Sequence, residues 1–191
     1  LWAWTMTGEQ ECRHVVEGIA NYVLRDLTHP EGGFYCAQDA QSEGKEGKCF
    51  CWTEGELSAL LTADEMKVAR EILGVSEEGN FIDRSDPEPL PNLNILSFKK
   101  PRTDLSESET KSVTGIFKKL AEVRGKRVPP ATDDKILASW NGLMIGAMAR
   151  TGRVLSEPKY LKAARRAHNF IKGRFWDVKS KRLAHRWREG D

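Results

Sequence analysis

The chain has 191 residues, enough to bury a sizeable core, with 39% hydrophobic and 30% charged residues. This composition excludes a disordered chain and indicates a soluble globular protein. The formal net charge is only +2, from 30 basic and 28 acidic residues, so we expect neither a nucleic-acid partner nor a membrane partner.

The first residues, Leu1 to Met6, are apolar and aromatic, which is typical of the end of a buried helix. They lack the basic start and small-residue cleavage site of a signal peptide. The sequence is therefore interpreted as a fragment of a longer protein. No apolar run reaches the roughly 18 residues that a membrane-spanning helix needs.

Apolar side chains recur at helical spacing over residues 9–26, which predicts the first long helix. The proline and glycines of residues 29–33 end it. Two short strands are then expected, at Phe34–Ala37 and Lys48–Trp52, on either side of the polar loop 38–47.

The cysteines Cys49 and Cys51 would share one face of the second strand, so metal binding or redox chemistry is one interpretation and structural thiols are the other. Cys-x-x-Cys is absent, and four cysteines are few for a disulfide scaffold of this length. Both facts favour a reduced, cytoplasmic location. The four histidines show no ligand spacing, so no metal site and no cofactor are expected.

Thr53 and Glu56 form the capping box of a short helix, and a second helix is predicted from about Asp64 to Leu73. Residues 74–105 are irregular except for a strand expected at Leu93–Phe98. Helical periodicity resumes at Ser106 and ends at Gly125.

The next helix is predicted to begin at Thr132 as its N-cap and to stop at Gly152. Gly142 and Gly146 in its middle have a Gly-x-x-x-Gly spacing, which predicts close packing against another helix. Its expected apolar stripe consists of Ile136, Leu137, Trp140, Leu143, Met144, Ala147 and Met148.

A last helix, capped by Ser156, covers residues 157–172, and Arg182–Trp187 reads as a strand. A helix, a turn and an aromatic strand thus occur twice, at 9–37 and 157–187. Repeated helices with short strands at one end suggest a mainly α fold of the α/α-toroid type. A ring of six hairpins would need about twice this length. We therefore expect residues 1–191 to form one partial (α/α)6 toroid domain.

A series of motifs supports this fold independently, because the chain resembles the spermatogenesis-associated protein 20 family of thioredoxin-domain-containing proteins over essentially its whole length. The motifs occur in the family's order and are Gly32-Gly-Phe-Tyr-x-Ala-x-Asp-Ala-x-Ser42, Glu46-Gly-Lys, Trp52-Thr, Gly79-Asn80, Asn94-Ile-Leu96, Arg124-x-x-Arg127 and Asp133-Asp-Lys-x-Leu-x-x-Trp-Asn-Gly-Leu-Met144.

The resemblance implies a thioredoxin-like domain followed by a toroid similar to six-hairpin glycosidases and N-acylglucosamine 2-epimerases. This chain would match the early-to-middle toroid only, and the thioredoxin-like domain of the same full-length protein would be its partner. One departure concerns the loop that usually reads Asp-Ala-Asp-Ser in the family. Here it reads Asp39-Ala-Gln41-Ser42, so one of two carboxylates is an amide.

The candidate catalytic residues are Asp39, Asp133, Asp134 and Lys135. Asp133 and Asp134 would either stabilise the first turn of a helix through its dipole or face a ligand. Asp39 would form an Asx-turn or act as an acid, a base or an acceptor for a sugar hydroxyl. Glycoside hydrolysis needs two carboxylates about 5–9.5 Å apart, so Asp39 and Asp133 are the candidate pair. Lys135 would orient a carboxylate or donate to a ligand.

The candidate substrate-binding residues are Tyr35, Gln41, Trp52, Trp140 and Asn141. The three aromatic rings could stack on a sugar, although a tryptophan in a helical stripe is also a typical core residue. Two functions follow as hypotheses. The first is a carbohydrate-active or sugar-isomerising domain with a small carbohydrate ligand. The second is a non-catalytic scaffold or binding domain coupled to the thioredoxin-like redox domain.

Overall fold

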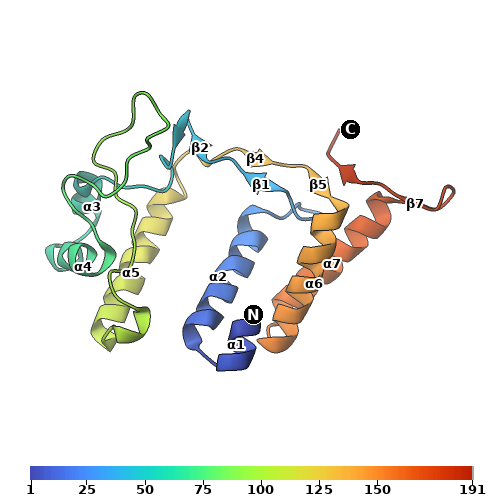
Figure 1. Cartoon of the computed structure of the whole chain (residues 1–191), viewed down its shortest axis with the longest axis horizontal. Coiled ribbons are helices and arrows are strands. Elements are labelled where there is room, and N and C mark those ends of the chain that lie inside the picture. The colour runs from blue at the N-terminus through green and yellow to red at the C-terminus, as the bar shows by residue number, and fades with distance from the viewer. Residues whose placement is uncertain (191) are drawn as a thin grey trace. The chain divides into compact units, whose positions relative to one another are not determined.

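The computed structural model describes residues 1–190, which form a mainly helical structure with short strands (Figure 1). The chain divides into two compact units. Unit 1 combines residues 1–38 with residues 132–190, and unit 2 is the continuous segment 39–131. Each unit has its own buried clusters, so the two are described separately. A single toroid domain remains a prediction.

Unit 1 contains four helices and three two-stranded ladders. The helices are α1 (Trp2–Thr7), α2 (Gln10–Asp26), α6 (Ala138–Val154) and α7 (Pro158–Arg174). The strands are β1 (Ala37–Gln38), β4 (Thr132–Asp133), β5 (Ile136–Leu137), β6 (Trp176–Asp177), β7 (Arg182–Leu183) and β8 (Arg186–Trp187). All pairs are antiparallel: β1 with β4, β5 with β8, and β6 with β7.

The core of unit 1 lies between α2, α6 and α7. The α6–α7 hairpin is visible in Figure 1, where β1, β4 and β5 lie at the end at which α6 begins. The buried side chains are Ala20, Val23, Phe34, Met148, Leu155, Tyr160, Ala164 and Ala167. A smaller cluster of Ile136, Phe170 and Phe175 joins the strands to α7.

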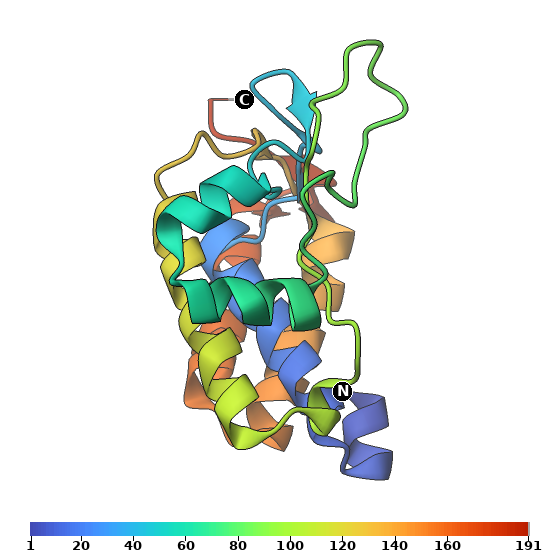
Figure 2. The ribbon, with the colours of Figure 1, turned by 90° about the vertical axis from the view of Figure 1, so that its left-hand side faces the viewer.

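Unit 2 contains the hairpin of β2 (Gln41–Ser42) and β3 (Lys45–Glu46) and three helices. The helices are α3 (Glu54–Leu60), α4 (Ala63–Leu73) and α5 (Glu107–Arg124), and a 3-10 turn, η1, covers Arg102–Asp104. Figure 2 shows α4 lying across α5. The buried cluster of this unit includes Leu57 of α3, Leu73 of α4 and Ile116 of α5.

Capping boxes fix the start of each helix in unit 2, as the sequence predicted for Thr53. The pairs Thr53 with Glu56, Thr62 with Glu65, and Ser106 with Glu109 each make both reciprocal hydrogen bonds. Local chemistry therefore places these helix ends within a residue of the expected positions.

Two predicted strands are absent from unit 2. Lys48 to Phe50 form turns, and both Cys49 and Cys51 are buried there rather than sharing a strand face. Leu93–Phe98 contributes only two isolated bridges, from Leu93 to Phe81 and from Asn94 to Trp52. The apolar content of both segments reflects burial, which a short irregular segment satisfies as well as a strand.

The predicted helix start at Thr132 is wrong, because α6 begins at Ala138 with Leu137 as its N-cap. Thr132 and Asp133 pair with β1, and Ile136 and Leu137 pair with β8. Their backbone groups are bonded to distant strands, which overrides the local capping signal. Asp133 and Asp134 are therefore not in the first turn of a helix, and the helix-dipole argument for them does not apply.

The next boundary also differs from the prediction. Helix α6 continues past Gly152 to Val154, and Ser156 has a positive φ of 57° instead of capping α7. Glu157 is the N-cap, and Pro158 occupies the first turn, where its missing N–H costs nothing.

Two packing expectations in unit 1 are corrected as well. Trp2 and Met6 of α1 are exposed, so this helix is not a buried one. A Cβ added at Gly142 or Gly146 would meet no atom within 4 Å, which means that these glycines do not provide close helix contact.

Candidate functional site

A cavity of about 110 Å³ in unit 1 is bordered by three of the predicted site residues, Tyr35, Trp140 and Asn141. Helix α2 supplies one apolar wall, α6 supplies another, and residues 34–36 lie between them. Trp140 is 55% exposed, so its ring is a surface residue beside the opening rather than a core residue. The remaining lining residues are Val23, Leu27, Phe34, Cys36, Leu137 and Met144.

The backbones of Asp133 and Lys135 are bonded to Cys36, one of the lining residues of this cavity. The Cys36 amide donates to the carbonyl oxygens of Asp133 and Lys135, at 3.2 and 3.0 Å. The Asp133 carboxylate lies 3.2 Å from Lys135 Nζ, an ion pair between half-buried side chains. Lys135 thus pairs with one of the two carboxylates that it was expected to orient, and the pair lies at the end of β4 rather than at a helix end.

Asp134 faces a different partner. Its Oδ1 atom lies 2.7 Å from Arg188 Nε, but the N–H direction does not give a hydrogen bond, so the contact is electrostatic. The negative charge of the Asp134 carboxylate acts on the Tyr35 phenol. Burial, together with the negative charges of Asp134 and Glu189, raises the pKa of the Tyr35 phenol.

His29 is a buried titratable residue near Tyr35 that the sequence did not single out. It is only 6% exposed, and its Nδ1 atom accepts a hydrogen bond from the Glu31 amide at 3.1 Å. Its ring contacts Tyr35, Phe170 and Trp187, with centroids 5.2 to 5.8 Å apart. The only sequence signal was a histidine at the start of the turn His29-Pro-Glu-Gly-Gly33, which does not distinguish burial from exposure.

The glycines of this turn are required by packing. A Cβ at Gly32, where φ is 125°, would lie 2.8–2.9 Å from backbone and Cβ atoms of Arg166. A Cβ at Gly33 would lie 2.8 Å from side-chain atoms of Ile136 and Phe170. The Gly-Gly-Phe-Tyr motif therefore allows the chain to approach α7 and to place Tyr35 beside the cavity.

Asn141 is 1% exposed, and its amide is bonded to the backbone. Its Oδ1 accepts from the Phe34 amide at 2.8 Å, while Nδ2 donates to the carbonyls of Phe34 and Leu137 at 2.9 and 3.0 Å. The side chain therefore joins the first turn of α6 to the segment before β1. This structural role explains an asparagine at the position that was predicted to bind substrate.

Two asparagines in unit 2 act in the same way. Asn94 pairs with both the N–H and the C=O of Ser76, and Asn80 pairs with both groups of Ile95. Each asparagine replaces a strand partner where the chain is irregular. These motif residues are therefore explained by backbone bonding.

The other predicted site residues belong to unit 2. Asp39 is exposed, and its Oδ1 accepts from the Gln41 amide at 3.1 Å, which is the expected Asx-turn. Gln41 is exposed in β2, opposite Glu46. Direct cooperation between Asp39 and Asp133, which lie in different units, remains a prediction.

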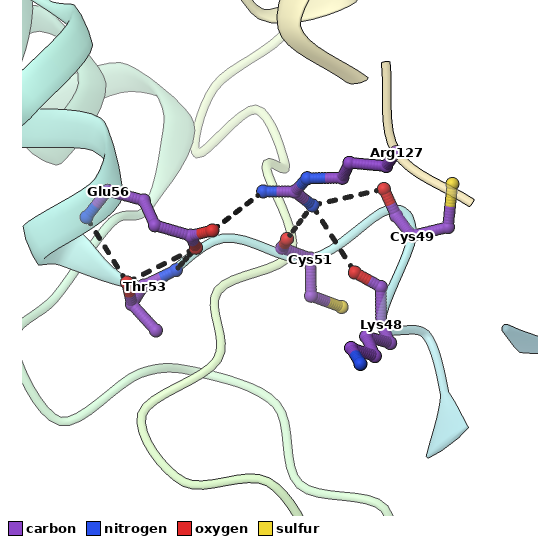
Figure 3. Close-up of polar contacts among 6 residues, drawn as sticks. All are labelled: Lys48, Cys49, Cys51, Thr53, Glu56 and Arg127. Atoms are coloured by element: carbon purple, nitrogen blue, oxygen red, sulfur yellow. Dashed lines mark hydrogen bonds and ion pairs between the residues drawn. The ribbon is translucent and has the colours of Figure 1, made fainter. Parts of the chain in front are cut away.

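The prediction that Trp52 stacks on a sugar is wrong. Trp52 is only 3% exposed, and the Arg127 guanidinium covers its ring at 3.8 Å from the centroid. Figure 3 shows the same guanidinium reaching the turn that precedes Trp52. Arg127 Nη1 donates to the carbonyls of Lys48, Cys49 and Cys51, and Nη2 donates to Glu56 at 3.0 Å.

All four cysteines are free. Burial raises the pKa of Cys36, with a further contribution from Asp133, and burial also raises the pKa of Cys51 despite the nearby Arg127. A raised pKa keeps these thiols protonated and poorly nucleophilic at neutral pH. Within residues 1–190, no group of three or more His, Cys, Asp or Glu side chains is arranged to hold a metal ion.

None of the described helices combines the length and apolarity needed to cross a bilayer. No protein-family model matches the chain. It is similar to spermatogenesis-associated protein 20 of Homo sapiens and of Mus musculus, each 33% identical over 95% of this chain. An uncharacterised protein of Caenorhabditis elegans is 30% identical over 86% of it.

The alignments cover only part of each relative: 26% of the two mammalian proteins and 25% of the nematode protein. The chain therefore spans about a quarter of the length of these relatives. The resemblance that the ordered motifs indicated is confirmed for this region.

Proposed function

We propose that this chain, which is homologous to about a quarter of spermatogenesis-associated protein 20, supplies one wall of a carbohydrate-binding site. The observation that carries the proposal is the unit 1 cavity, which has Tyr35 and Trp140 among its lining residues and Asp133 and Lys135 beside it. Sugars present an apolar ring face and a hydroxylated edge, and aromatic walls with a neighbouring carboxylate complement both. The toroid architecture belongs to the same proposal.

The proposed roles follow from the exposure of each group. Trp140 stacks on the apolar face of the sugar, because its ring is half-exposed at the opening. Asp133 accepts from a sugar hydroxyl or transfers a proton, and Lys135, 3.2 Å away, orients its carboxylate. Asp134, which pairs with Arg188, supports the segment that carries Asp133. Asp39, which belongs to unit 2, stays a separate candidate for an acid or base role.

Binding of sugars to the whole chain tests the proposal. We expect saturation-transfer NMR to detect glucose, N-acetylglucosamine or glucose 6-phosphate on the parent chain and to lose the signal in Trp140→Ala. Trp176→Ala is the matched control, because Trp176 is another partly exposed tryptophan of unit 1, 44% exposed and outside the cavity lining. No signal from any sugar, or equal loss in both variants, contradicts the proposal.

A second function is favoured by the bonding of the motif residues. Asn80, Asn94, Asn141 and Arg127 all hold backbone groups, which suits a non-catalytic scaffold coupled to a thioredoxin-like domain. In that case Gln41→Asp changes stability but creates no turnover. If the loop transfers protons in a sugar reaction, the same change raises turnover by about 10²–10⁴-fold.

A further inference from the structure

Helix α7 carries charges of one sign, a feature that the proposed function does not explain. Its sequence contains no aspartate or glutamate, and its basic residues are Lys159, Lys162, Arg165, Arg166, His168, Lys172 and Arg174. Helices α2 and α5, by contrast, mix acidic and basic residues. Since the net charge of the whole chain is only +2, the positive charge is concentrated on α7.

These charges do not stabilise the helix itself. Lys159 lies in the first turn, where a positive charge opposes the helix dipole. Lys162 and Arg166 are four positions apart, a spacing at which like charges destabilise a helix. Within residues 1–190, no acidic side chain forms an ion pair with Lys162, Arg165 or Lys172. The stability of α7 therefore does not account for its charge.

The exposed charges follow one edge of the helix. Lys162, Arg165, Asn169 and Lys172 are separated by three or four positions and are all exposed, so they form a continuous line of side chains, termed the basic strip. With a rise of about 1.5 Å per residue, the strip is about 15 Å long. This length corresponds to almost three turns of a helix lying alongside it.

A hollow of about 380 Å³ opens beside the basic strip. Its lining residues are Glu31, Asn169, Phe170, Gly173 and Arg174. Asn169 belongs to both the strip and the hollow. Arg174 Nη2 donates to the Glu31 carboxylate at 2.7 Å, and both side chains are about half-exposed. The hollow therefore already holds one carboxylate against an arginine, where a second carboxylate can reach it from solvent.

We propose that α7 binds a short, acidic, helical segment of a partner protein. Carboxylates of that segment, three or four positions apart, face Lys162, Arg165 and Lys172. A further carboxylate enters the hollow and competes with Glu31 for Arg174. The two surfaces match in charge and in spacing, because all helices have the same period. This surface is separate from the sugar site, since no residue of α7 lines the unit 1 cavity.

Two other anionic partners fit α7 less well. Helices that lie on membranes place large apolar side chains beside their charges. Within Pro158–Arg174, all of which the structure describes, Leu161 is the one large apolar side chain that is exposed. Nucleic acids are attracted by the charge of a whole surface, and a chain with a net charge of +2 attracts them weakly. An acidic protein segment needs only the local match.

A synthetic peptide tests the proposal on the whole chain labelled with ¹⁵N. The probe is an alanine-based helical peptide with glutamate at every third or fourth position, and the same peptide with glutamine is its control. At about 50 mM salt, we expect the glutamate peptide to shift the amide NMR signals of α7, and at about 1 M salt the shifts should vanish because exposed charges are screened. The glutamine peptide should cause no shift.

Charge reversal locates the binding surface. Lys162→Glu, Arg165→Glu and Lys172→Glu together should weaken peptide binding about tenfold or more, because each exposed ion pair contributes up to about fivefold. The matched control reverses three exposed lysines of unit 2, Lys67, Lys111 and Lys118. The control changes the net charge equally and should weaken binding by less than about threefold, since distant exposed charges are screened.

Removal of the competing carboxylate tests the hollow. Glu31→Gln leaves Arg174 without its ion pair and should tighten peptide binding by about two- to fivefold. Glu122→Gln makes the same change of charge at an exposed position of α5 and should leave the affinity unchanged. Because Glu31 is half-exposed, this variant keeps the test available even if the triple variant does not fold.

Each outcome decides the proposal. The absence of shifts on α7, or equal weakening by the two triple variants, overturns it. Tighter binding of oligouridine RNA or of phosphatidylserine vesicles than of the glutamate peptide to α7 overturns the acidic protein segment as the partner. Equal affinities of Glu31→Gln and the parent remove the hollow from the site.

Discussion

At the scale of single residues, polar side chains in this protein replace missing secondary structure. Asn141 is the clearest case, because one buried amide satisfies the Phe34 N–H, the Phe34 C=O and the Leu137 C=O. Phe34 precedes a two-residue strand and has no continuous sheet partner. A donor–acceptor side chain in the first turn of α6 supplies the bonds that a neighbouring strand would otherwise make.

We predict that Asn141→Ala lowers the free energy of unfolding by about 2–4 kcal/mol, since each buried group left unsatisfied costs about 1–3 kcal/mol. Urea denaturation measures the change. Asn169→Ala is the control, because Asn169 is exposed on α7 and should change stability by less than about 0.5 kcal/mol. Equal effects of the two substitutions would show that the bonds of Asn141 contribute little.

Arg127 serves the same purpose with a charged group. Its planar fork bonds to three carbonyl oxygens and Glu56 while stacking on Trp52, and a lysine cannot reproduce this geometry. Arg127→Lys is therefore expected to cost about 1.5–3 kcal/mol despite keeping the charge. Urea denaturation tests this value.

Chemical rescue gives a sharper test of the same site. Millimolar ethylguanidinium should partly restore the stability of Arg127→Ala, because the three converging carbonyls remain available. It should not restore Arg124→Ala, whose guanidinium lies over the Phe50 ring 5.6 Å from the centroid. Failure to distinguish the two variants would contradict the proposed bonding.

At the scale of secondary-structure elements, replacing a glycine by alanine should lower stability where other atoms surround the glycine and raise it where none do. Gly33→Ala places a methyl group 2.8 Å from Ile136 and Phe170, so we expect a loss of about 1–3 kcal/mol from overpacking. Gly142→Ala meets no atom within 4 Å on α6 and should gain about 0.5–1 kcal/mol from reduced backbone entropy in the unfolded chain. Thermal or urea unfolding measures both changes in stability. A gain for Gly33→Ala and a loss for Gly142→Ala would refute the packing account.

The capping box of α5 should make the stability of unit 2 sensitive to acid. Hydrogen bonds from Ser106, followed by that from Lys100, lower the pKa of Glu109 from 4.5 to about 2. Because the pKa is lower in the folded state, this contribution is complete above the unfolded value and is lost as the pH falls from about 5 to 2.

Glu109→Gln tests this prediction. The glutamine keeps a capping acceptor but does not ionise, so the variant should be less stable than the parent at pH 7 and should lose less stability on acidification. Unfolding curves between pH 7 and pH 2 measure the difference. Parallel pH profiles for parent and variant would contradict the assignment.

At the scale of the whole molecule, unit 2 is inserted between two paired strands of unit 1. Gln38 and Thr132, the residues that flank it, face each other in the β1–β4 ladder. The large buried cluster of unit 2 lies entirely within residues 39–131, and both clusters of unit 1 lie outside that segment. Each unit therefore has the apolar interior that independent folding requires.

We predict that both units fold alone. Residues 39–131 should give a helical circular dichroism spectrum and a cooperative unfolding transition. Unit 1 should fold when an Asn-Gly turn joins Gln38 to Thr132, because antiparallel neighbours can be linked by two residues. A non-cooperative transition in either piece would show that its core depends on the other unit.

The sequence by itself determined the helices whose signals are local. Helical periodicity and the Thr53–Glu56 capping box located α3, α4 and α5, and the ordered motifs identified the homologous region. The same reasoning gave a carboxylate partner as one of two interpretations of Lys135 and an Asx-turn as one of two interpretations of Asp39. Apart from the ordered motifs, each of these features depends on residues that are close in sequence, so the local pattern carries the information.

Only the tertiary structure decided features that join distant segments. Pairing with β1 and β8 moved the start of α6 from Thr132 to Ala138, because strand bonds from other parts of the chain outcompeted a good cap. The burial of Trp52 under Arg127 and the packing of His29 against Trp187 likewise connect residues 75 or more positions apart. Local patterns specify which side chains are apolar or polar, but long-range packing decides what each one faces.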